Sequence, residues 1–265
     1  MKLMWRASCL GAIFIFQAFA QTAEKPVPAP KSEKPAPFSR QAVVTQNGDA
    51  INIAANSARP LLQTLDALQQ KFGWIVDYED PRYISHLDYA NVPGDDTRPQ
   101  VPAGGNFSVD ISAKASEAET LRLVVDSYNQ SKNPGRFEVR AGEQSQFYVV
   151  GTGAHDEKDS ISPQRALFDI PVTISTEERT IADTIHLICE AAAKQAGTTV
   201  TLGVSPRNFL EHTPAKIGGT KVPARDLLLQ CLAATHRNLS WRLLYDPSSQ
   251  GYFLDIHAAP KPKAA

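Results

Sequence analysis

The chain has 265 residues, which is enough for one large domain or two small ones. Its 27 lysines and arginines nearly balance 28 aspartates and glutamates, and it contains no basic run that could follow a phosphate backbone. This charge pattern argues against nucleic acid as the main partner. Hydrophobic residues make up 42% and charged residues 21% of the chain, so the composition supports real hydrophobic cores.

Residues 1–20 have the features of a secretory signal peptide. A short basic start precedes a mostly apolar stretch at 7–19, and Ala18 and Ala20 are the small residues that signal peptidase requires. We therefore predict cleavage after Ala20 and a periplasmic or secreted protein. An uncleaved N-terminal anchor is the alternative. No other stretch is apolar enough to cross a membrane, so we expect no membrane span in the mature chain.

Proline-rich segments separate the predicted folded units from their surroundings. Residues 21–40 predict an extended linker, because proline at this density favours polyproline geometry without a packed core. A first α+β unit is predicted at 41–153, a linker at 154–166 and a second α+β unit at 167–258. The tail at 259–265 is again proline-rich.

The first unit reads as strand, helix, strand, loop, strand, helix and hairpin. Asn47 and Gly48, between two apolar strands, tolerate the positive φ angles of a tight turn. Apolar residues at helical spacing predict a helix over 61–72. Alternation over 107–112 predicts a strand with one buried face. Ser116 then starts a second helix, with a glutamate three residues later that completes a capping box.

The second unit repeats this order of elements. The equivalent positions are Gly73 and Gly197, Leu121 and Leu227, and Phe147 and Tyr252. An internal repeat of this kind indicates one supersecondary unit used twice. We therefore predict an α+β protein with two similar small units in tandem, each with two helices packed on one face of a small mixed sheet.

Parts of both units resemble a known family. The second unit is similar to the short N-terminal domain of secretins and TonB-dependent receptors at 222–232, 239–242 and 252–256. The first unit resembles it more loosely at 58–78 and 119–150. In that family the domain is not catalytic, and it builds periplasmic rings or contacts a membrane regulator. The resemblance implies an interaction role for this chain, in which we expect no receptor plug, barrel or secretin pore.

Cys189 and Cys231 lie on the two predicted helices of the second unit. We expect these helices to pack side by side, so a disulfide is geometrically possible if the Cα atoms come within about 7 Å, and export permits it. The alternative is two buried thiols that act as small apolar groups. His186 and His236 lie near them in sequence, but the spacing matches no recognised zinc motif. We predict no metal site and no cofactor.

Two polar regions of the first unit are candidates for function. The acidic cluster at 77–80 matches no calcium-binding loop, so we predict a solvated strand end there. The insertion at 81–105 is the candidate contact loop, because long loops in compact domains are often functional. Its candidate contact residues are Tyr83, His86, Tyr89, Asp95 and Asp96.

Three functions remain open from the sequence. The first is an exported, non-enzymatic interaction or assembly module that acts through protein contacts in the cell envelope, with an envelope protein or a second copy as partner. The alternative is a small-ligand or cell-wall binding protein that uses the cleft between the units. The third is a secreted hydrolase, for which we find no set of nucleophile, base and acid.

Overall fold

The computed structural model describes residues 38–92, 99–142 and 146–259, all within one compact unit. The predicted signal peptide, with Ala18 and Ala20, lies outside the described residues, as do Asp95 and Asp96. Among the described residues, no helix is long and apolar enough to cross a membrane.

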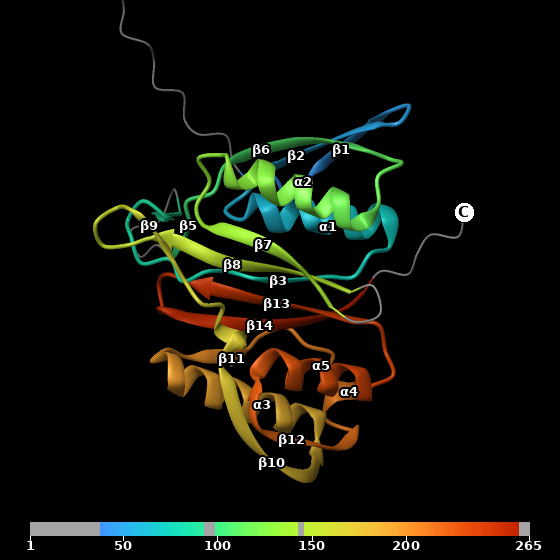
Figure 1. Ribbon diagram of the computed structural model, residues 1–265, viewed down its shortest axis with the longest axis vertical. Coiled ribbons are helices and arrows are strands. Elements are labelled where there is room, and N and C mark those ends of the chain that lie inside the picture. Colours follow the sequence, from blue (N-terminus) through green and yellow to red (C-terminus); the bar gives the residue numbers. More distant parts are fainter. Residues whose placement is uncertain (1–37, 93–98, 143–145, 260–265) are drawn as a thin grey trace, which may run out of the picture. The chain divides into compact units, whose positions relative to one another are not determined.

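The described residues form an α+β protein with five α-helices and several sheets (Figure 1). The first half contains β1 (Val43–Asn47), β2 (Ala50–Asn56), α1 (Pro60–Phe72), β3 (Val76–Glu79), β4 (Tyr89–Asn91), β5 (Gln100–Pro102), β6 (Asn106–Ser112), α2 (Glu117–Asn129), β7 (Arg136–Ala141), β8 (Phe147–His155) and β9 (Ile161–Pro163). The second half contains a 3-10 helix (Leu167–Asp169), β10 (Pro171–Thr180), α3 (Ile181–Ala196), β11 (Val200–Leu202), α4 (Arg207–Leu210), β12 (Pro214–Pro223), α5 (Ala224–Ala234), β13 (Leu239–Asp246) and β14 (Gly251–Ala258).

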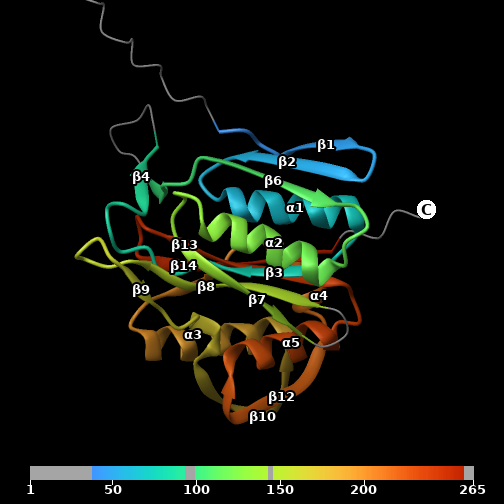
Figure 2. The same ribbon diagram turned by 45° about the horizontal axis from the view of Figure 1, so that its top comes forward.

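In the first half, helices α1 and α2 lie between two sheets (Figure 2). One sheet is antiparallel, in the order β1-β2-β6, and the other contains β3, β8 and β7. Alternate residues of β2, such as Ile51 and Ile53, are fully buried against the helices. The prediction of helices on one face of a single sheet is therefore wrong in this respect. Alternation shows that a strand has one buried face, but it does not show which strands share a sheet.

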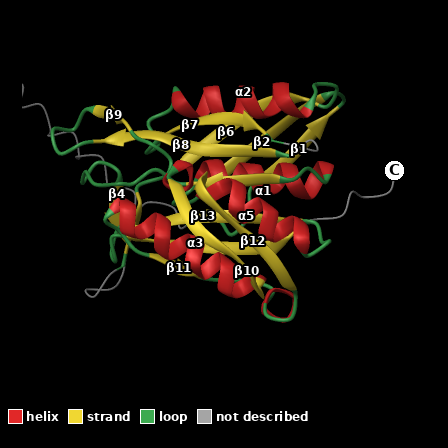
Figure 3. Cartoon of the chain, turned by 60° about the horizontal axis from the view of Figure 1, so that its bottom comes forward, coloured by secondary structure: helices red, strands yellow, loops and turns green. Residues whose placement is uncertain are grey.

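The second half has the same kinds of strand pairing as the first. Strands β10 and β12 pair antiparallel, as β2 and β6 do. Strands β11 and β14 pair in parallel, as β3 and β8 do. Strands β13 and β14 pair antiparallel, as β7 and β8 do. Helices α3 and α5 pack against each other, and both contact β12 (Figure 3).

The two halves share one sheet. Strand β13 pairs in parallel with β3, with Arg242 opposite Tyr78 and Leu243 opposite Glu79, which gives the order β11-β14-β13-β3-β8-β7. The helix pairs pack on opposite faces of this sheet, because Val76 and Tyr78 lie in the first-half core while alternate residues of β13 lie in the second-half core. We call the β13–β3 contact and the side chains around it the joint.

The ends of several elements agree with the sequence patterns. Gly73 and Gly197 adopt left-handed conformations directly after α1 and α3, and Ser116 forms the capping box at the start of α2. The segment predicted as a linker at 154–166 instead contains the end of β8 and all of β9, which pairs with β8. This pairing extends the shared sheet beyond the predicted boundary of the first unit.

Candidate functional site

The acidic residues at the end of β3 are buried inside the joint. Asp77 and Glu79 have no exposed surface and Asp80 is 1% exposed, so the predicted solvated strand end is wrong. The cause is that β3 lies inside the shared sheet, between β8 and β13, and that a hydrophobic core covers each face of this sheet. The sequence around β3 gives no local sign of this pairing, since β13 lies far along the chain.

Two of these carboxylates accept hydrogen bonds from the backbone of β13. Asp77 Oδ1 accepts from the Trp241 N–H at 2.8 Å, and Asp80 Oδ2 accepts from the Tyr245 N–H at 3.0 Å. The backbone pairing of β13 with β3 covers only Arg242 and Leu243. The two carboxylates accept from the N–H groups just before and just after this pairing, which would otherwise be buried without an acceptor. Burial raises the pKa of Asp77 to about 7, against the hydrogen bonds that its carboxylate accepts.

Arginines pair with two of the buried carboxylates of the joint, Glu79 and Asp80. Arg225 Nη2 lies 2.6 Å from Glu79 Oε2, and its Nη1 pairs with Asp169. Arg59 Nε lies 2.7 Å from Asp80 Oδ2. Buried ions of this kind need partners, because leaving one unpaired costs several kcal/mol. The carboxylates of the joint are thus occupied in holding the halves together, and this arrangement gives them a structural role.

Cavities lie where the halves meet. One of about 530 Å³ lies between the β7–β8 hairpin and α5, and it is lined in part by Tyr148, Arg225 and Asp226. A second, of about 470 Å³, is lined by residues of both halves, among them Arg59, Pro102 and Phe253. Both Nη atoms of Arg225 already bind carboxylates of the protein. The guanidinium is therefore committed to the joint.

The structure does not gather the candidate contact residues of the insertion on one surface. Tyr83 is 2% exposed, its hydroxyl donates to Asp80 Oδ1 at 3.3 Å, and its ring packs on Tyr245, so it belongs to the interior. His86 is exposed, with Nδ1 3.7 Å from Asp159 Oδ1. Tyr89 is half-buried in β4. The proposed contact surface therefore loses Tyr83, because this aromatic side chain fills a core position at the joint.

A histidine–aspartate pair lies at the base of the same insertion, and no sequence pattern pointed to it. Asp88 is fully buried, and its carboxylate accepts from the His155 N–H at 2.7 Å and lies 2.6 Å from His155 Nδ1. This pair connects the insertion to the end of β8. Within the described ranges, no group of three or more His, Cys, Asp or Glu residues could hold a metal ion.

Cys189 and Cys231 are both buried in the second-half core, and neither forms a disulfide in the structure. Burial raises the pKa of the Cys189 thiol to about 12, with a smaller contribution from Cys231. Burial also raises the pKa of Cys231 to about 12. Because the thiolate is the reactive form, both groups are inert in the folded protein.

Thiol titration distinguishes these buried thiols from the candidate disulfide between Cys189 and Cys231. With Cys9 replaced by serine, we expect no fast-reacting thiol in the native protein and two thiols after denaturation without reductant, since both cysteines are free and buried. The measurement is a colorimetric thiol assay at neutral pH. No thiol after denaturation would establish the disulfide instead.

The free edges of the sheets differ in how well they are protected. At one end of the shared sheet, the side-chain amide of Asn129 donates to the Phe137 C=O and accepts from its N–H, which occupies part of the outer edge of β7. At the other end, β11 has only three residues. In the sheet of β10 and β12, both strands carry charged residues, both contain proline, and their register shifts. Charges, prolines and bulges are the features that protect an edge from pairing.

Strand β1 lacks all of these protective features. Its five residues are Val43, Val44, Thr45, Gln46 and Asn47. None of them is charged or proline, all are exposed, and the register with β2 has no shift. Val43 is 63% exposed, which is high for a strand valine. The outer edge of β1 is therefore the candidate functional site.

Comparisons with protein-family models, with curated proteins and with solved structures found no match for this chain.

Proposed function

We propose that this chain is an exported, non-enzymatic module that acts through protein contacts in the cell envelope. The joint carries this proposal. One half binds the other by placing the edge strand β13 beside the edge strand β3, with buried carboxylates completing the hydrogen bonds. In the described part of the chain, no strand pairs with the outer edge of β1. Proteins commonly recognise extended segments by adding a strand to such an edge.

We further propose that the halves are two copies of one unit. The support is that each pairing of strands in the first half has a counterpart of the same direction in the second half. The resemblance of residues 222–256 to the short N-terminal domain of secretins and TonB-dependent receptors favours the same conclusion. It also favours a role in contact, since that domain is not catalytic.

The predicted signal peptide supports the extracytoplasmic location in this proposal. A short basic start, an apolar stretch and small residues at Ala18 and Ala20 are the features that signal peptidase recognises. N-terminal sequencing of the exported protein should give Gln21 as the first residue.

A small-ligand binding protein is the second candidate function. The cavity of about 530 Å³ between the β7–β8 hairpin and α5 favours it, since this volume lies in the usual range for ligand sites. The interaction function has the stronger support, because Arg225 in that cavity is already bound to Glu79 and Asp169.

Affinity capture tests the proposed function. The mature chain, tagged at its C-terminus, is incubated with native envelope extract, and retained proteins are identified by mass spectrometry and then purified. We expect one envelope protein, or the chain itself, to bind the pure module in a direct titration. An unrelated exported protein with the same tag serves as the control.

The contrary result has two parts, both of which are measurable. A strictly monomeric protein by light scattering, with no envelope partner in the titration, would remove the support for an interaction module. Saturable binding of a small molecule at the cavity lined by Tyr148 and Arg225 would then favour the second candidate.

A further inference from the structure

The backbone groups on the outer edge of β1 are oriented to accept another strand. Just before β2, the Ala113 N–H donates to the Asp49 C=O. Hydrogen-bonded pairs recur at every second residue, so the odd-numbered residues of β2, such as Ile51, bond to β6. The backbone groups of successive residues in a strand point to opposite sides, so the even-numbered residues of β2 bond to β1. Their partners in the register are the odd-numbered residues of β1. The N–H and C=O groups of Val44 and Gln46 therefore point away from β2.

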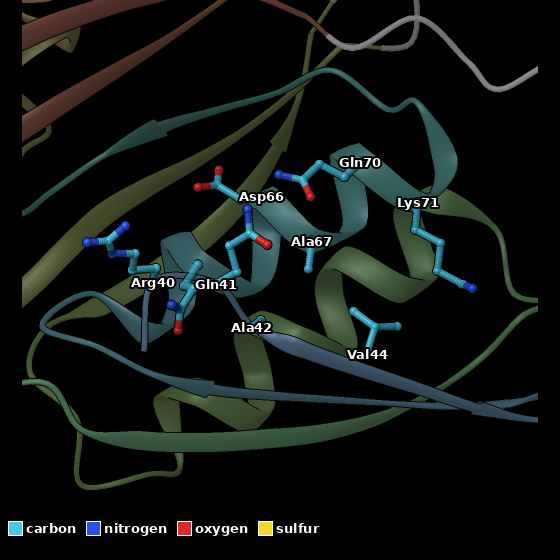
Figure 4. A pocket seen from close by; sticks show the side chains of 9 residues that line it. Arg40, Gln41, Ala42, Val44, Asp66, Ala67, Gln70 and Lys71 are labelled. Atoms are coloured by element: carbon cyan, nitrogen blue, oxygen red, sulfur yellow. The ribbon is translucent and has the colours of Figure 1, made fainter. Parts of the chain in front are cut away.

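A groove of about 510 Å³ runs beside this edge, between β1 and the outer flank of α1 (Figure 4). Its walls come from β1 and the residues before it, and its floor comes from α1. The lining residues are Arg40, Gln41, Ala42, Val44, Gln63, Asp66, Ala67, Gln70 and Lys71. A strand added to β1 would lie over this groove, and every second side chain would enter it.

The groove presents positive charge to an occupant. Arg40 and Lys71 lie at opposite ends of it in Figure 4. The single carboxylate of the lining, Asp66, pairs with Arg242 of β13 and is therefore neutralised. Lys71 is held in place, with Nζ donating to Gln46 Oε1 at 2.7 Å. The free charges of the groove thus match acidic side chains, while Ala67 and Val44 leave room between them.

We propose that an extended acidic segment of a partner protein adds to the outer edge of β1 as a fourth strand and places its acidic side chains in this groove. The inference rests on the proposed function, because it names the partner's chemistry for that interaction. Strand β1 is about 17 Å long at ~3.3 Å per residue, so the partner contributes about five to seven residues. A second copy of this chain fits less well, since β1 carries no acidic residue.

Peptide binding tests this inference with the wild-type chain. The probe is a fluorescein-labelled peptide of about seven residues that alternates glutamate and valine. We expect saturable binding by fluorescence anisotropy, and binding at least about tenfold weaker for the peptide that alternates lysine and valine. Two glutamate peptides carry N-methyl groups on alternate residues, one in each register. The peptide whose N-methyl groups face β1 should not bind, because it cannot complete the backbone ladder, and the peptide whose N-methyl groups face outwards should bind.

Variants of the edge and of the groove locate the site. Val44→Pro removes a backbone N–H that points away from β2, and it should weaken peptide binding at least about tenfold. Val43→Ala changes a side chain on the opposite face of the strand and should leave the affinity unchanged.

Reversing both groove cations, Arg40→Glu with Lys71→Glu, should transfer the preference to the lysine peptide. Lys132→Glu, which changes an exposed cation elsewhere, should preserve it. Circular dichroism confirms that each variant is folded.

Several outcomes would contradict the binding of an acidic segment at β1 and would leave the proposed interaction function standing. Equal binding of both N-methylated peptides would show that the backbone ladder does not select the ligand, and equal binding of the lysine peptide would show that the charges do not. An envelope partner that binds the Val44→Pro and cation-reversal variants as tightly as wild type would place the interaction elsewhere. A wild-type dimer that Val44→Pro dissociates would make a second copy the occupant. Absence of any protein partner would instead remove the proposed function.

Discussion

Replacing Glu79 with alanine should lower the free energy of unfolding by about 3 kcal/mol, because the buried Arg225 guanidinium would lose one of its carboxylates. Arg225 is 6% exposed and keeps only Asp169 as a charged partner in this variant. The Phe168 N–H would also lose its acceptor, Glu79 Oε1. Urea denaturation followed by tryptophan fluorescence measures the change.

An exposed ion pair provides the control for this prediction. Glu138 pairs with Arg140 on the surface of β7, and Glu138→Ala should cost less than about 1 kcal/mol. Replacing Glu79 and Arg225 together with leucine should recover much of the loss, because no buried charge is then left unpaired. Equal losses for Glu79→Ala and Glu138→Ala would show that the joint does not depend on its buried charges.

Replacing Asp77 with asparagine should stabilise the protein by on the order of 2 kcal/mol at about pH 8. Burial raises the pKa of Asp77 from 3.8 to about 7, so the folded state binds a proton that the unfolded chain releases. Wild-type stability therefore falls as pH rises from about 4 to about 7 and stays low above that range. Asparagine keeps an oxygen for the Trp241 N–H and carries no charge to bury.

Stability measured across this pH range tests the prediction. The two proteins should converge as the pH falls below 3.8, where Asp77 becomes protonated in both the folded and the unfolded state, and they should diverge towards pH 8. Some pH dependence should remain in the variant, since burial also raises the pKa of Asp66 to about 6. Asp126→Asn, at an exposed site on α2, is the control. A variant less stable than wild type at pH 8 would mean that hydrogen bonds to the ionised carboxylate outweigh its burial.

Local patterns in the sequence were sufficient for most of the secondary structure. The alternation around Ile51 and Ile53, the glycines that end α1 and α3, and the capping box at Ser116 all involve neighbours within a few residues. Each pattern reflects a periodicity or a terminal hydrogen bond that the chain carries wherever it folds. These features could be predicted because they do not depend on distant parts of the chain.

The joint could not be predicted because its partners lie far apart in sequence. Asp77 reads locally as the polar face of a strand, and only its hydrogen bond from Trp241, 164 residues away, makes it a buried acceptor. Tyr83 reads as a loop aromatic and becomes a core residue for the same reason. The open edge of β1 was also missed, since its exposure depends on the order of strands in the sheet. Amino-acid composition and local residue spacing give no information about these tertiary contacts.

The position of β13 near the C-terminal end of the chain has a consequence for biosynthesis. The first half is synthesised early, but its strand β3 obtains its second neighbour only when residues 239–246 emerge. Until then Asp77 and Asp80 lack their backbone donors on β13, and an inner strand of the finished sheet is open to wrong partners. A product that terminates before β13 would therefore leave one edge of β3 unpaired and the carboxylates of Asp77 and Asp80 without these donors.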